Sequence, residues 1–137
     1  MFLDTSALVA LFTSKRAADR IAKEAGDSEF YVSCVELAEL ADWATRSGVP
    51  AAERLDAVEQ MASVVPLTKD ICLEAAEIKS ARRKEGVSTF GIIDGIILST
   101  ARSLGQSLLT FDADFEGEED CVVLRQSRSI PRPDSDP

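Results

Sequence analysis

The chain has 137 residues, no histidine and a formal net charge of −9 at pH 7, from 24 Asp and Glu against 15 Lys and Arg. This length fits one domain, and the acidic balance argues against a protein that coats nucleic acid through a broad basic face. The lack of histidine excludes catalysis by an imidazole base and most zinc hydrolases. Any hydrolytic chemistry must therefore use carboxylates, hydroxyls, lysine or a metal held by oxygen ligands.

The sequence shows no targeting signal and no closely spaced pair of cysteines. No run approaches the ~20 apolar residues of a membrane span, and the first residues lack the basic region and cleavage site of a signal peptide. We therefore expect a cytoplasmic protein with no membrane association. The cysteines Cys34, Cys72 and Cys121 are scattered and form no C-x-x-C pair, so we expect buried free thiols and neither disulfides nor a zinc site.

The predicted elements alternate between strands and helices. Residues 2–4 form a short strand, and the helical pattern over 5–26 has a break at Thr13 and Ser14. A strand over 29–33 leads into a helix that begins with Ser33 and Glu36 at the spacing of a capping box. The later elements are helices over 34–47, 50–62, 69–86 and 90–105 and strands over 63–67, 107–112 and 121–125.

This alternation predicts an α/β fold, a three-layer α/β/α sandwich with a mainly parallel four- to five-stranded sheet. We expect one domain over residues 1–126 and a polar, proline-containing tail over 127–137 that does not pack. Ligands of such sheets bind beyond the carboxyl ends of the strands. Three of the expected strands deliver acidic residues to that edge, which makes it the candidate site.

Four acids stand out at this edge. Asp4 ends the first strand, Asp112 ends the strand over 107–112, and Glu39 lies between apolar neighbours about one turn into its helix. Asp94 lies early in a helix that is apolar on nearly every side, where an ionised carboxylate needs a partner. Asp4 alone is explained as a helix cap and Asp94 as a complement to a helix dipole.

Other acids are weighed in the same way. Glu36 is explained by the capping box, and the acids over 116–120 are typical of a solvated surface run. Asp114 lies two residues after Asp112, so both carboxylates can point toward one centre. Several carboxylates at one edge without a basic neighbour repel one another unless a cation neutralises them. Mg²⁺ or Mn²⁺ prefers such oxygen ligands and promotes phosphodiester hydrolysis.

The segments "MFLDTSALVALF", "YVSCVELAEL" and "FGIIDGIILSTARSLGQSLLTFDADF" together resemble the PIN domain, in the small form of the VapC-type toxin ribonucleases. The resemblance implies a Mg²⁺- or Mn²⁺-dependent endoribonuclease, the toxin of a type II toxin–antitoxin pair, with an RNA substrate, a cognate antitoxin and a homodimeric state. It matches the catalytic acids to Asp4, Glu39, Asp94 and Asp112. It implies metal binding by Asp4, Asp94, Asp112 and Asp114, and auxiliary hydroxyls at Thr5 and Thr110.

The candidate RNA contacts are Lys15, Arg16, Arg82, Arg83 and Lys84. Solvated helix faces explain each of these residues equally well. Two alternatives remain open. One is a catalytically weak PIN-fold protein that binds a partner, because the chain has little positive charge to hold RNA. The other is an aspartyl-phosphate receiver, which needs an acidic pair near the N-terminus and a lysine on a late strand, neither of which is present.

Overall fold

The computed structural model describes residues 1–125, so the predicted tail over 127–137 lies outside the described residues. Its sheet has five strands in the order β3-β2-β1-β4-β5, and every neighbouring pair is parallel. The strands are β1 (Phe2–Leu3), β2 (Phe30–Ser33), β3 (Ala62–Val65), β4 (Leu108–Thr110) and β5 (Cys121–Val123). The helices are α1 (Thr5–Thr13), α2 (Lys15–Ala25), α3 (Cys34–Ser47), α4 (Ala51–Met61), α5 (Lys69–Lys84), α6 (Ile92–Ser103) and the 3₁₀ turn η1 (Ala113–Phe115).

The pattern over residues 5–26 forms two helices, divided at the predicted break. Ser14 has extended backbone angles, and its N–H donates to the carbonyl of Ala10 to end α1. The same serine then begins α2, because its Oγ accepts from the N–H of Ala17 at 3.1 Å. Helix α3 begins with the predicted capping box, in which Glu36 Oε1 accepts from the N–H of Ser33 at 2.9 Å.

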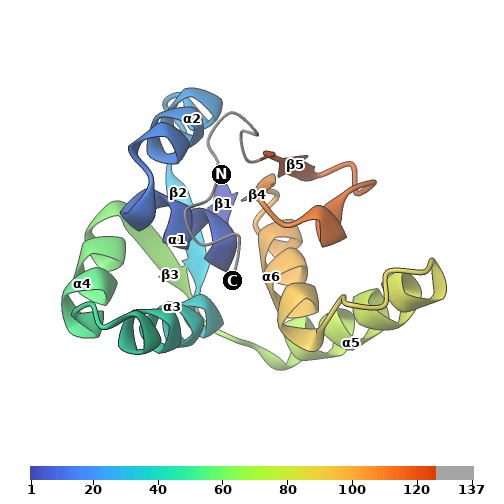
Figure 1. The fold of residues 1–137 in the computed structure, drawn as a ribbon. Coiled ribbons are helices and arrows are strands. Elements are labelled where there is room, and N and C mark those ends of the chain that lie inside the picture. Colours follow the sequence, from blue (N-terminus) through green and yellow to red (C-terminus); the bar gives the residue numbers. More distant parts are fainter. Residues whose placement is uncertain (126–137) are drawn as a thin grey trace, which may run out of the picture.

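Helices cover both faces of the sheet, as the alternation predicted. Phe2 and Leu108 point to one face and pack with the apolar residues of α5 and α6. Their neighbours Leu3 and Leu109 point to the other face and pack with α1 to α4. Figure 1 shows α5 and α6 grouped together, apart from α1 to α4. The three-layer arrangement is therefore confirmed, with the short central strands buried on both faces.

The strand order reverses beside β1. The chain runs outward from β1 to β2 and β3, and then α5 and α6 carry it back to β4 and β5 on the other side of β1. In open α/β sheets the ligand crevice lies outside the carboxyl ends of the strands at this switch point. Asp4 directly follows β1 and Asp112 follows β4 after one residue, so both lie at the switch point.

The surface differs from expectation at one cysteine. All three thiols are free, and Cys34 and Cys121 are partly buried, but Cys72 is exposed, which corrects the prediction of buried thiols. The reason is that α5 buries a single stripe that includes Ile71 and Ala75.

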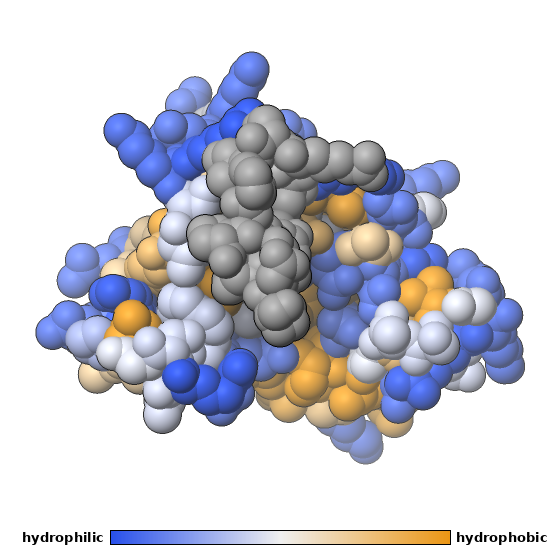
Figure 2. All heavy atoms as spheres, in the orientation of Figure 1, coloured by the Kyte–Doolittle hydropathy of each residue, from blue (hydrophilic) through white to orange (hydrophobic). Residues whose placement is uncertain are grey.

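Figure 2 shows a largely hydrophilic face with an apolar area at the lower edge of the view. Within residues 1–125, no helix is long and apolar enough to cross a membrane.

Candidate active site

Asp4 lies at the centre of the candidate site and is 3% exposed. It is the N-cap of α1, and its Oδ1 accepts from the N–H of Ala7 at 2.9 Å and from Ser6 Oγ at 2.7 Å. Its Oδ2 accepts from Thr110 Oγ1 at 2.5 Å. Burial raises the pKa of Asp4 to about 6, and these hydrogen bonds limit the rise because they favour the ionised carboxylate. The cap and the site are thus the same side chain.

Asp112 faces Asp4 across the switch point. Its backbone N–H donates to Thr110 Oγ1 at 2.9 Å, and its Oδ1 accepts from the N–H of Asp114 at 2.9 Å, which caps η1. The hydroxyl of Thr110 therefore lies between Asp4 and the backbone of Asp112. The negative charge of Asp112 also raises the pKa of Asp4, although less than burial does.

Asp94 and Glu39 reach the site from helices on opposite faces of the sheet. Asp94 is the third residue of α6, and its Oδ2 accepts from the N–H of Gly91 at 2.7 Å. Partial burial raises the pKa of Asp94 to about 6, and the charges of Asp112, Asp114 and Glu39 add to this rise. Glu39, on α3, accepts a hydrogen bond from the hydroxyl of Thr5. The four predicted acids and Asp114 therefore share one electrostatic environment.

Glu36 contributes a further buried carboxyl group that the sequence explained only as a cap. Its side chain is fully buried, and within the described chain its Oε2 has no hydrogen-bond partner. Burial raises the pKa of Glu36 well above its ordinary value, and the charges of Asp4 and Glu39 raise it further. The capping role is confirmed, but Glu36 also lies close enough to the site to interact with its charges.

Two polar residues that contact the acids of the site, Ser6 and Thr89, were not predicted from the sequence as site residues. Ser6 accepts from the N–H of Phe111 at 2.9 Å while it donates to Asp4, so it links the ends of β1 and β4. The sequence signal for Ser6 is its position two residues after a strand-end aspartate, where short polar side chains form hydrogen bonds with the local backbone. Thr89, in the loop before α6, donates to Asp114 Oδ2 at 2.7 Å. No local sequence pattern marks Thr89.

The structure corrects the candidate RNA contacts at one position. Lys15, Arg16, Arg83 and Lys84 are exposed. Arg82 is 5% exposed, and its guanidinium donates to the backbone carbonyls of the segment after β4. Both Nη atoms of Arg82 therefore bind groups inside the protein, so this buried residue is not positioned to contact RNA.

The donor atoms of the site fit a hard divalent cation. They are carboxylate and hydroxyl oxygens, the ligands that Mg²⁺ and Mn²⁺ prefer. The ion pairs found within residues 1–125 involve other acids, on the surface and after η1. No three acidic or cysteine side chains in this range already converge as a metal site. The carboxylates are instead held by local hydrogen bonds around the switch point.

The chain is therefore an α/β protein with a parallel sheet and an acidic site at the switch point of that sheet. The PIN domain model matches residues 1–117, and the chain belongs to this family. A search of curated proteins gives no match.

Solved structures share the fold at low sequence identity. One is described as a toxin–antitoxin complex from Klebsiella pneumoniae, with a TM-score of 0.73 and 23% identity over 89% of this chain and 95% of that chain. Another is VapBC2 from Rickettsia felis bound to a DNA fragment from its promoter, with a TM-score of 0.71 and 17% identity over 90% and 96%. A third is VapC20 from Mycobacterium tuberculosis, described as a sarcin–ricin loop cleaving toxin, with a TM-score of 0.71 and 23% identity over 91% and 98%.

Proposed function

We propose that this chain is a cytoplasmic, Mg²⁺- or Mn²⁺-dependent endoribonuclease and the toxin of a type II toxin–antitoxin pair. One observation carries the proposal. Carboxylates from the ends of β1 and β4 and from helices on both faces of the sheet interact electrostatically at the switch point of a PIN domain. Such a group of charges requires a cation to hold an anionic phosphodiester nearby.

The proposed metal ligands are Asp4, Asp94, Asp112 and Asp114. A bound divalent ion would lower the pKa of a water molecule and offset charge on the phosphate. Mg²⁺ keeps several of its waters and takes one or two carboxylates directly, so the proposal does not require three side chains that already converge.

The hydroxyl groups position these acids. Ser6 and Thr110 hold Asp4 in its ionised form through the hydrogen bonds described above. Thr5 orients the carboxylate of Glu39, which would accept a proton from the attacking water. Each of these residues therefore has a role that its contacts support.

The substrate and partners are proposed from the structural neighbours. These are described as toxin–antitoxin proteins, and one as a toxin that cleaves the sarcin–ricin loop. By analogy we propose an RNA substrate, a homodimer, and an antitoxin that places a basic side chain among the acids. The proposed RNA contacts are the four exposed basic residues Lys15, Arg16, Arg83 and Lys84.

The test is cleavage of labelled single-stranded and structured RNAs with Mn²⁺ or with EDTA. We expect the wild type to cleave only with Mn²⁺. Asp4→Asn is expected to lose at least about 100-fold in rate, since even groups that only support a metal ligand cost about 10- to 100-fold. Asp42→Asn is the matched control, because Asp42 is exposed and, within residues 1–125, pairs only with Arg46 on α3. Cleavage that persists in EDTA or in Asp4→Asn would contradict the mechanism.

A further inference from the structure

Arg82 is a buried arginine whose contacts converge on the segment that carries two acids of the site. It lies in the last turn of α5 and is 5% exposed. One guanidinium nitrogen, Nη2, donates to the carbonyls of Asp114 and Glu116, the latter at 3.0 Å. Charged groups are rarely buried unless they are paired and hydrogen-bonded, so these contacts offset much of the cost of burying Arg82, although its Nε has no hydrogen-bond partner within residues 1–125.

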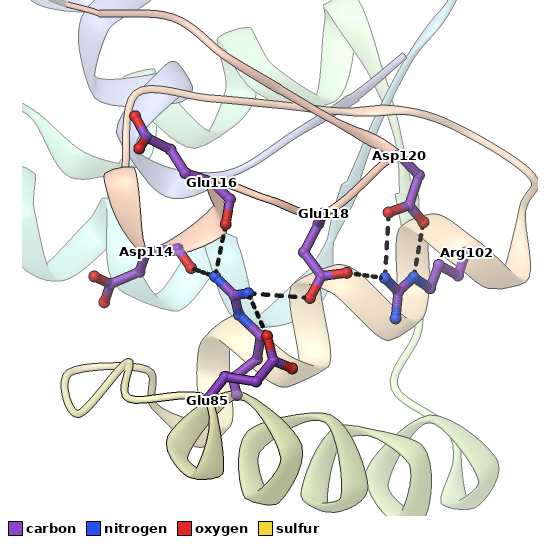
Figure 3. A network of polar contacts seen from close by, with 7 residues as sticks. Glu85, Arg102, Asp114, Glu116, Glu118 and Asp120 are labelled. Carbon is purple, nitrogen blue, oxygen red and sulfur yellow. Dashed lines mark hydrogen bonds and ion pairs between the residues drawn. The ribbon is translucent and has the colours of Figure 1, made fainter.

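The other contacts of Arg82 complete a network around the same segment. Nη1 lies 3.3 Å from Glu85 and 3.4 Å from Glu118. Glu118 and Asp120 in turn pair with Arg102, each at 2.7 Å. Figure 3 shows this network, in which Glu116, Glu118 and Asp120 belong to the segment after η1 and Glu85 lies at the end of α5.

Within this network, Arg82 but not Arg102 contacts the backbone of η1 and the aromatic residues packed beside it. The guanidinium of Arg82 lies over the Phe90 ring, 5.7 Å from its centroid, and Phe90 packs edge-on against the buried ring of Phe115 at 5.5 Å. Arg82 thus contacts the carbonyl of Asp114 while the loop before α6 holds the Asp114 carboxylate through Thr89. Asp114 is therefore held both at its backbone carbonyl and at its side chain.

We propose that Arg82 is a positioning residue for the acidic site: by binding the carbonyls of residues 114 and 116, it fixes η1 so that Asp112 and Asp114 face Asp94. The expected effect of Arg82 on activity rests on the proposed nuclease function, whereas its expected effect on residues 112–118 does not. The planar fork of arginine can bind two carbonyls and two carboxylates at once, and the single ammonium of lysine cannot reproduce this arrangement.

Arg82→Met and Arg82→Lys test this role, with Arg102→Met as the matched control. Arg102 belongs to the same network and pairs with Glu118 and Asp120, but it does not bind the carbonyls of η1. Hydrogen exchange of the amides over residues 112–118 gives a readout that needs no activity. We expect faster exchange in this segment for Arg82→Met and near wild-type exchange for Arg102→Met.

Metal binding and kinetics give the second readout. For Arg82→Met we expect a loss of about 10- to 100-fold in Mn²⁺ affinity and of about 100-fold in kcat, as for a catalytic group displaced by about 1 Å, with little change in KM. Arg82→Lys should recover part of both. The proposal is overturned if Arg82→Met lowers only the melting temperature and leaves exchange over 112–118, Mn²⁺ affinity and kcat within about twofold of wild type, as a purely structural role predicts.

The two proposals fail in different ways. A wild type that cleaves no RNA with Mn²⁺ overturns the proposed function, and the exchange of residues 112–118 then still decides the role of Arg82. If Arg82→Met does not fold, Arg82→Lys carries the test, because it keeps the charge and removes only the fork.

Discussion

At the scale of single residues, hydrogen-bond donors limit how far burial raises the pKa of a carboxyl group. Asp4 accepts from Ser6, Thr110 and a backbone N–H, and its pKa rises to about 6. Glu36 is equally buried but within residues 1–125 accepts only from the N–H of Ser33, and its pKa rises well above the ordinary value. Fewer donors favour its ionised form, and the nearby charges of Asp4 and Glu39 oppose that form further. Asp4 is thus kept ionisable near neutral pH although it is buried.

Thr110→Val tests this role of a hydroxyl. The substitution keeps the shape of the side chain but removes the donor to Asp4 and the acceptor for the N–H of Asp112. We expect a higher pKa for Asp4 and an Mn²⁺ affinity about 10-fold lower by calorimetry. Thr110→Ser keeps the hydroxyl and should bind Mn²⁺ nearly as the wild type does. Equal affinity in the valine and serine variants would show that the hydrogen bond does not matter.

At the scale of elements, α5 and α6 approach closely at one glycine, next to a proposed metal ligand. A Cβ built on Gly95 would lie 2.5 Å from the carbonyl oxygen of Ala75 on α5, so no larger residue fits without separating the helices. Asp94 is the neighbouring residue. The distance between the two helices therefore fixes the position of that carboxylate.

Gly95→Ala is expected to destabilise the fold by about 1–3 kcal/mol, the usual cost of overpacking, and to weaken Mn²⁺ binding because α6 must move with Asp94. Chemical denaturation and Mn²⁺ titration measure the two effects. Ser80→Ala, at an exposed position of α5, is the control and should stay within about 0.5 kcal/mol of wild type. A Gly95→Ala variant as stable as Ser80→Ala would contradict the close approach.

The positions of the helices and strands could be predicted from the sequence better than the contacts between them. Periodicity and caps located the strands and helices, and the parallel-sheet rule placed Asp4 and Asp112 at one edge. The position of the switch point was not predictable, because β1 pairs with β4 through residues such as Phe2 and Leu108, more than 100 positions apart. The burial of Arg82 was missed for the same reason, since it depends on carbonyls of a distant loop.

At the scale of the whole molecule, the buried acids make stability depend on pH, and under the proposed function they make it depend on metal as well. The pKa values of Asp4 and Asp94 rise from 3.8 to about 6. Between these values the folded protein holds protons that the unfolded chain has released, so the free energy of unfolding must fall as pH rises. Asp4 alone contributes about 3 kcal/mol to this fall. Asp120 has the opposite effect on stability, because its pairing with Arg102 lowers its pKa. Its contribution to the free energy of unfolding is lost only as the pH falls below about 3.8.

We therefore predict that the melting temperature of the metal-free protein decreases from about pH 4 to about pH 6. Mn²⁺ should raise it strongly at about pH 7.5 and weakly at about pH 5, because the ion competes with protons for the carboxylates. Thermal melts with EDTA and with Mn²⁺ measure both effects. Glu36→Gln should reduce the loss of stability at higher pH and keep the Mn²⁺ effect, because its amide oxygen still accepts from Ser33. Asp4→Asn should reduce both. A melting temperature that rises through this range in EDTA, or an equal Mn²⁺ effect at both pH values, would contradict the prediction.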